Sequence, residues 1–151
     1  MVQRVRPPDD LEGLPARAGY VDAYAAPARI ADGRSARAWA DLILDDAGPT
    51  VLAVIRTVQR GAGLLLVTPE PPNLAVGWAV LHEEPDHVVL GVEGRVYTPR
   101  VVLAVRQESL LLVTAVEPRG LVGRLVWTLV APLHRVTVRT LTAAAERVAA
   151  R

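Results

Sequence analysis

Few side chains in this sequence are of the types that act as nucleophiles, metal ligands or acid–base groups in active sites. The residue types that are missing exclude several classes of site. The sequence has three histidines, three tyrosines and no cysteine. All 17 basic residues are arginine, because no lysine is present. Without a thiol or a lysine amine, disulfides, thiolate catalysis, Cys-ligated metal and Schiff-base catalysis are excluded. A P-loop lysine is excluded for the same reason.

The histidines are His82, His87 and His134. A zinc site needs at least three converging protein ligands. His82 precedes Glu83 and Glu84, but neighbouring residues of a strand point to opposite faces of a sheet, and His87 is expected in a turn. We therefore predict neither a metal site nor a cofactor.

His134 and Arg100 each have two interpretations. His134 can act as an acid or base that faces a cavity, but the sequence favours a structural role, in which the ring bonds a backbone carbonyl beside Pro132. Arg100 can clamp a carboxylate, enolate or phosphate inside a cavity, or it can be a solvated charge beside an acidic neighbour. Ser109 and Thr114 have no evident base and acid companions, which argues against a Ser-His-Asp hydrolase.

The six aromatic residues of tyrosine and tryptophan type are first of all core fillers. A buried tyrosine hydroxyl needs a hydrogen-bond partner, so the tyrosines can also supply polar points in an apolar pocket. The candidate catalytic residues are Tyr97, Arg100 and Tyr24. The candidate ligand-binding residues are Tyr20, Trp78, His82, Val101, Trp127 and His134.

These side chains are distributed over strands and helices that the hydrophobic periodicity predicts. A first strand is expected over residues 20–26. Two short helices follow, over 35–46 and 49–60, and Gly48-Pro49 separates them because proline suits the first position of a helix. Short runs rich in Val and Leu predict antiparallel strands within residues 76–84, 86–94, 95–107 and 109–118.

The C-terminal stretch from Gly120 predicts one long helix, which Pro132 should kink. Its expected solvent-exposed row consists of Arg124, Thr128, Ala131, Arg135, Arg139, Thr142 and Glu146. One expected buried flank consists of Leu125, Leu129, Leu133 and Val136, and the other of Trp127, Val130, His134, Val138 and Leu141. A buried arc this wide exceeds what one neighbouring helix covers. We therefore expect the helix to lie against a curved antiparallel sheet.

The predicted fold class is α+β, with a curved antiparallel sheet wrapped around the C-terminal helix and two short helices after the first strand. This element order is that of the helix-grip fold, in which a cavity commonly remains between sheet and helix. Residues 1–13 are expected to be a flexible lead-in, and residues 14–151 a single domain.

The sequence resembles the domain-of-unknown-function family 2867, of the START-like, polyketide-cyclase-like helix-grip (SRPBCC) superfamily. The best motif consists of Gly123, Arg124, Trp127, Pro132, His134 and Arg135. Weaker marks are Leu90-Gly91, Arg100-Val101 and Thr114. The family tends to carry a polar strand motif where this chain has Val96 in place of histidine and Thr98 in place of aspartate, so any activity resting on that motif is not expected here.

Bulk properties narrow the partners further. Hydrophobic residues make up 51% of the 151 residues, which indicates a packed core. The net charge of +1 gives no strong field for nucleic acid. We expect no transmembrane helix, no signal peptide and a cytoplasmic location.

Three functions fit these observations. In the first, the cavity binds a hydrophobic, polyketide- or lipid-like molecule and catalyses its cyclisation by positioning, in secondary-metabolite biosynthesis. In the second, the protein is a non-catalytic carrier or sensor of such a molecule. In the third, it is a structural or interaction module with a filled core, for which pairing into a homodimer through sheet edges is expected.

Overall fold

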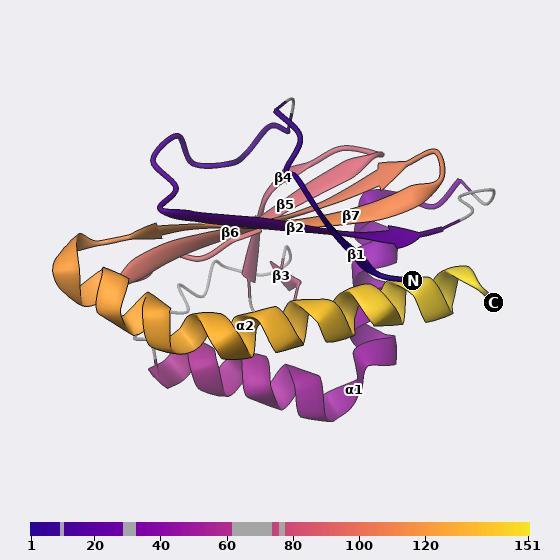
Figure 1. Ribbon diagram of the computed structural model, residues 1–151. Helices are drawn as coiled ribbons and strands as arrows, with labels where there is room; N and C mark the ends of the chain where they lie inside the picture. Colours follow the sequence, from indigo (N-terminus) through magenta and orange to yellow (C-terminus); the bar gives the residue numbers. More distant parts are fainter. Residues whose placement is uncertain (10, 29–32, 62–73, 76–77) are drawn as a thin grey trace.

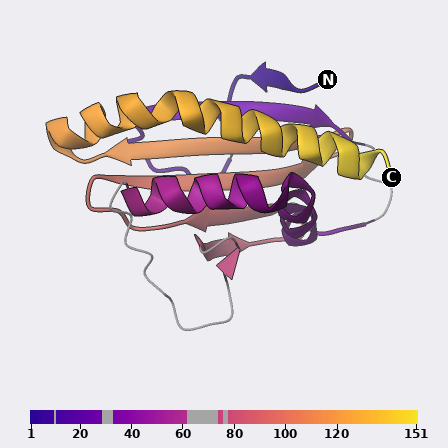
Figure 2. The same cartoon turned by 90° about the horizontal axis from the view of Figure 1, so that it is seen from below.

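The computed structural model describes residues 1–9, 11–28, 33–61, 74–75 and 78–151. It confirms the α+β class: an open, curved antiparallel sheet is covered on one face by helices (Figures 1 and 2). The elements are β1 (Gln3–Val5), β2 (Tyr20–Pro27), α1 (Ala36–Gly61), β3 (Leu74–Ala75), β4 (Trp78–Glu83), β5 (His87–Gly91), β6 (Tyr97–Arg106), β7 (Ser109–Pro118) and α2 (Gly120–Ala149).

The described part of the sheet has the strand order β1-β2-β7-β6-β5-β4-β3. The predicted meander from β4 to β7 is confirmed, because every consecutive pair is antiparallel. The long strand β2 lies beside β7, with Asp22 opposite Thr114. Pro99 is tolerated inside β6 because the β5 ladder already ends at the Gly91–Arg100 pair, which leaves Pro99 without a strand to donate to on that side.

The two faces of the sheet follow the period of two along each strand. Leu103 of β6 packs with Ile43 and Val148 of the helices on the face that we call the inner face. Val102 belongs to a separate cluster on the opposite, outer face. Arg100 shares this outer face, as the alternation along β6 predicts.

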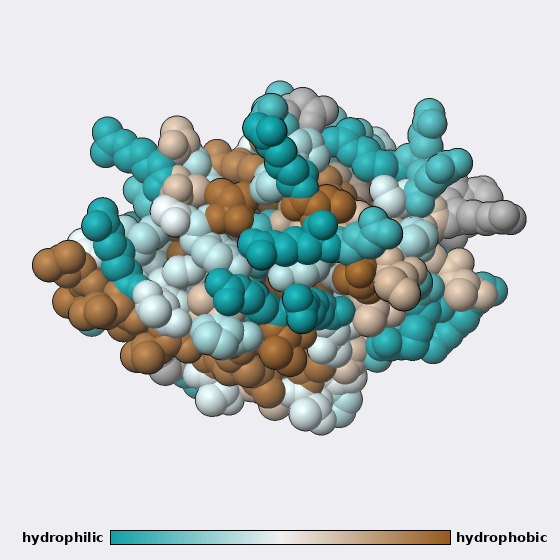
Figure 3. All heavy atoms as spheres, in the orientation of Figure 1, coloured by the Kyte–Doolittle hydropathy of each residue, from teal (hydrophilic) through white to brown (hydrophobic). Residues whose placement is uncertain are grey.

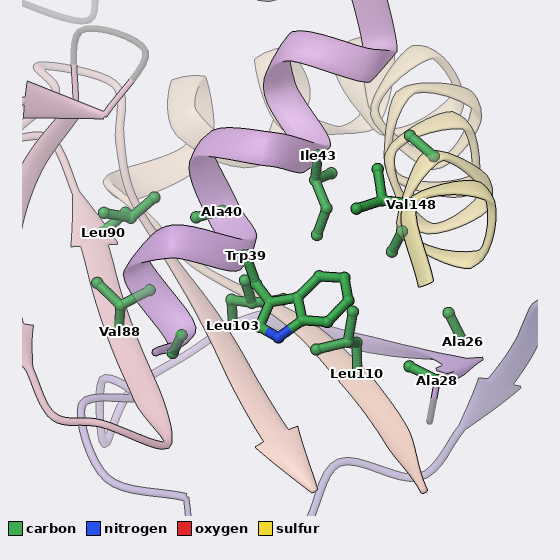
Figure 4. Packing of buried hydrophobic residues seen from close by; sticks show 13 residues of the cluster. Ala26, Ala28, Trp39, Ala40, Ile43, Val88, Leu90, Leu103, Leu110 and Val148 are labelled. Atoms are coloured by element: carbon green, nitrogen blue, oxygen red, sulfur yellow. The ribbon is translucent and has the colours of Figure 1, made fainter. Parts of the chain in front are cut away.

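Helix α1 occupies the region where two short helices were expected. The chain is kinked there, because Gly48 leaves helical geometry with φ 80° and ψ 171°, directly before Pro49. A positive φ of this kind favours glycine. Before this break, the indole of Trp39 lies at the centre of the main core cluster, beside Leu103 and Leu110 of the sheet (Figure 4).

Helix α2 runs beside α1 across the inner face and continues through Pro132 as one helix (Figure 2). Its rotation about its own axis differs from the prediction in part. Arg124, Arg135 and Arg139 are exposed as expected, but Ala131 and Thr142 of the same predicted row are buried. These two residues face the protein interior, together with the flank of Trp127.

The flank of α2 that was expected to be buried is instead exposed. Leu125, Leu129, Leu133 and Val136 all belong to the exposed large hydrophobic residues, as do Leu121 and Val122. We call these six residues the α2 apolar stripe, and a brown patch marks the N-terminal half of this helix in Figure 3. The sheet and α1 cover the side of α2 that carries Trp127 but leave the stripe uncovered. The width of the apolar arc therefore did not predict how much of the helix is buried.

The N-terminal segment, expected to be a flexible lead-in, is partly built into the fold. β1 pairs with β2, placing Arg4 opposite Tyr24. Leu11 and Leu14 pack on the outer face in the cluster of Val89 and Val102. The segment therefore lies against the outer face of the sheet (Figure 1). Among the described residues, no helix has the length and apolar character needed to cross a membrane.

Candidate functional site

A cavity of about 160 Å³ lies between the inner face of the sheet and the two helices. Val101 and Tyr97 of β6 form part of its sheet wall, and Ile55 of α1 and Val130 of α2 form part of its helical walls. The two helices pack side by side, with α2 over β2 and β7 and α1 over β5 and β6 (Figure 2). The walls are mostly apolar, which suits a hydrophobic ligand.

Five residues that line the cavity carry buried polar atoms for which the described residues provide no hydrogen-bond partner. These atoms are the amide oxygen and nitrogen of Gln59, Nε1 of Trp78, Oγ1 of Thr114, Nε1 of Trp127 and Nε2 of His134. A buried polar group without a partner costs about 1–3 kcal/mol. A ligand with hydrogen-bonding oxygens would offset part of that cost.

A polar cluster formed by Tyr20, Asp22 and His134 borders this cavity. The Tyr20 hydroxyl donates a hydrogen bond to Oδ2 of Asp22 at 2.7 Å. Nε2 of His134 lies 3.4 Å from the same oxygen, within ion-pair range but not aligned for a hydrogen bond. The carboxylate of Asp22 is buried, and its Oδ1 has no partner among the described residues.

The surroundings of this cluster set the pKa of two of its members. Burial acts to raise the pKa of Asp22, but its contacts with His134 and Tyr20 act in the opposite direction and leave it below its usual value. Burial, followed by the hydrogen bond to Asp22, raises the pKa of Tyr20. Asp22 is therefore an anion at neutral pH that can orient the imidazole of His134.

Trp127 is at the centre of the aromatic contacts around the cavity. Its ring centroid lies 5.0 Å from that of Tyr20, 5.3 Å from that of Tyr97 and 5.2 Å from that of His134. The two tyrosines approach at interplanar angles of 61° and 68°, the edge-to-face geometry that aromatic pairs prefer. Trp127 therefore connects the polar cluster to the wall at Tyr97.

Tyr97 is a buried, neutral hydrogen-bonding group at neutral pH. It is 2% exposed, and burial raises its pKa to about 12. Its hydroxyl thus keeps its proton over the physiological range and can donate it in a hydrogen bond to a ligand carbonyl.

The structure brings together five of the nine predicted site residues around the cavity. These are Tyr97, Trp78, Val101, Trp127 and His134. Tyr20 joins them indirectly, through its ring contacts with Trp127 and His134. Tyr24 is buried on the inner face but does not line the cavity.

Arg100 and His82 are not part of this site. Arg100 lies on the outer face, where its guanidinium contacts Oε1 of Glu93 at 2.9 Å. His82 is exposed at the end of β4 and lies 3.2 Å from Glu84. The alternation along β6 accounts for Arg100, since Val101 is the neighbour that faces the cavity.

Sequence reasoning missed Asp22, Thr114 and Gln59 as site residues. The signal for Asp22 was available, because it shares one strand face with Tyr20 and Tyr24. For His134, the favoured structural interpretation differs from the geometry: among the described residues its ring bonds no backbone carbonyl and instead approaches Asp22. The contact joins residues far apart in sequence, so periodicity could not reveal it.

Comparison with known proteins identifies a family for this chain. The sequence model described as "Protein of unknown function (DUF2867)" matches residues 14–141. No curated protein matches the chain. No solved structure matches it either.

Proposed function

Since this chain belongs to the DUF2867 family, whose description specifies no ligand, we propose a function from its cavity: it binds a hydrophobic small molecule that carries hydrogen-bonding oxygens. The observation that carries this proposal is an apolar cavity lined by five residues whose buried polar atoms find no hydrogen-bond partner in the described part of the chain. A filled core would bury such atoms only at a cost. The polyketide-like class fits best, because it combines apolar carbon with ketone and hydroxyl oxygens.

The volume limits the size of the ligand. An engineered protein cavity of about 150 Å³ lined by apolar residues binds benzene, and the present cavity of about 160 Å³ is similar. The enclosed part of the ligand is therefore about one or two rings or a short chain. A longer chain would extend through the open side of the cavity.

Acid–base catalysis is a second candidate function, and the His134–Asp22 pair favours it. An anionic Asp22 can stabilise a protonated His134, while the neutral hydroxyl of Tyr97 can polarise a ketone. In a ring closure, His134 would remove a proton from the carbon beside one ketone. The resulting enolate carbon would attack a second ketone, and the new alkoxide would take the same proton back from the imidazolium of His134, which returns to its starting form. Holding the two reacting ends together supplies much of such a rate enhancement.

Binding can be tested on the purified chain with 1-naphthol, a two-ring phenol. Trp78 and Trp127 line the cavity, so we expect saturable quenching of tryptophan fluorescence. Val130→Phe should fill the cavity and weaken binding at least about tenfold, which corresponds to about 1.4 kcal/mol. The matched control is Val136→Phe on the exposed side of the same helix, which should bind like the wild type.

Two results would contradict the proposal: no saturable binding by the wild type, or equal effects of the two phenylalanine variants. Native mass spectrometry of the protein as purified would add the mass of any molecule that it retains. Turnover of a short diketone that His134→Gln abolishes, while 1-naphthol still binds, would favour catalysis over carriage.

A further inference from the structure

We propose that the outer face of the sheet carries a second site, which binds a divalent metal ion of the zinc type through Glu12, His82 and His87. One potential ligand atom from each residue lies within 4.8 Å of those of the other two. The two imidazole rings are 5.2 Å apart, centroid to centroid. This site is on the face opposite the cavity and does not depend on the function proposed above.

The fold brings these three residues together from separate parts of the sequence. His82 and His87 lie on β4 and β5, in a hairpin that the bond from the amide of Glu84 to the carbonyl of His87 closes at 2.8 Å. Glu12 comes from the N-terminal segment, next to Gly13, which lies against Val89 on the outer face.

A break in the β4–β5 register places His82 beside His87. The pairing shifts between Val80, opposite Leu90, and His82, opposite Val89. Such a bulge changes the direction of a side chain relative to simple alternation. Simple alternation, which would point His82 away from the other potential ligands, therefore does not hold in this strand.

Each histidine is oriented by a carboxylate in the manner of metal-binding histidines. Oδ1 of Asp86 lies 3.0 Å from Nδ1 of His87, and Oε1 of Glu84 lies 3.2 Å from Nε2 of His82. The second nitrogen of His87, Nε2, is buried and has no hydrogen-bond partner among the described residues. A metal ion would supply that partner.

The donor set matches zinc. Two imidazole nitrogens and one carboxylate oxygen are the three protein ligands of many zinc sites that keep a fourth position open to water. Glu84 and Asp86 add negative charge beside the ion. Bound metal would connect the N-terminal segment to the β4–β5 hairpin and so stabilise the covering of the outer face.

The test is calorimetric titration of Zn²⁺ into the full chain at pH 7, after removal of metal with EDTA. We expect one ion per chain. His82→Ala, His87→Ala and Glu12→Gln should each weaken binding at least about tenfold, since the loss of even an orienting partner costs about 10–100-fold. Asp86→Asn should weaken it within that range. The matched control is Glu108→Gln, an exposed carboxylate in the β6–β7 turn, which should leave the affinity unchanged.

A second measurement reports the coordination geometry of the bound metal ion. Co²⁺ bound in place of Zn²⁺ should show the intense visible absorption of a tetrahedral site, and Glu12→Gln should remove it. Absence of Zn²⁺ binding by the wild type would overturn the proposal. So would retention of full affinity by both Glu12→Gln and His82→Ala, because a neighbouring group formed by Glu84, Asp86 and His87 would then hold the ion. The titration with 1-naphthol should be the same for all these variants, which separates this site from the cavity.

Discussion

At the scale of single residues, the site is defined by polar groups held in apolar surroundings. Asp22 keeps its charge because Tyr20 and His134 contact its carboxylate. Tyr97 keeps its proton because burial raises its pKa to about 12. The sheet wall can therefore offer two different groups: the carboxylate of Asp22 beside the imidazole of His134, and the neutral hydroxyl of Tyr97 as a hydrogen-bond donor to a ligand.

The raised pKa of Tyr97 predicts how stability depends on alkaline pH. The unfolded chain releases this proton near pH 10, whereas the folded chain holds it to about pH 12. The contribution to the free energy of unfolding is therefore complete below about pH 10 and is lost as the pH rises to about 12, by on the order of 2 kcal/mol. Urea denaturation across this window should show the loss in the wild type.

Tyr97→Phe has no proton to release, so its stability should fall less steeply over the same pH range. A variant with the same alkaline slope as the wild type would show that Tyr97 is not the group responsible. The variant should also bind 1-naphthol, since the ring that forms the cavity wall remains.

At the scale of elements, the two sides of α2 have different roles. Trp127 is 8% exposed and contacts the cavity residues, whereas Leu129 of the apolar stripe is 81% exposed. Both were expected to be buried, because sequence alone gives the width of an apolar arc but not the amount of surface available to cover it.

A matched pair of alanine substitutions on α2 tests this difference. Trp127→Ala should lower the free energy of unfolding by about 3–5 kcal/mol, the range for large aromatic side chains in a core. Leu129→Ala should change it by less than about 0.5 kcal/mol, as is usual for exposed sites. Chemical denaturation monitored by circular dichroism gives both values. Similar losses for the two variants would mean that a partner or another part of the chain covers the stripe.

At the scale of the whole molecule, the N-terminal segment covers the outer face as the helices cover the inner face. Val89, Val102 and Val113 are nearly inaccessible, and Leu11 and Leu14 pack against their cluster. The sheet is therefore a middle layer between two different coverings. The expected homodimer remains a prediction, and the α2 apolar stripe is one surface through which two copies can associate.

Removal of residues 1–13 tests whether this covering contributes to folding. We expect a clear drop in melting temperature, because the truncation removes β1 and exposes apolar residues of the outer cluster. Glu12→Gln serves as the control, since it alters the proposed metal ligand but keeps the covering chain. A truncated chain that melts like the wild type would fit the flexible lead-in predicted from sequence.

Local sequence patterns predicted the α+β class, the meander of four strands, the break at Gly48-Pro49 and the long C-terminal helix. These features follow from local periodicity and from residues that restrict the backbone, such as Pro49. The period of two likewise places Tyr97 and Val101 on one side of β6 and Arg100 on the other, because alternation is a local property.

Three features depend on long-range packing: the side of α2 that is buried, the approach of His134 to Asp22, and the approach of Glu12 to His82 and His87. Each of these features depends on contacts between segments that are separated by many residues in the sequence. They depend on how the layers stack and on one register shift in β4, and the period of a single strand or helix contains no information about either.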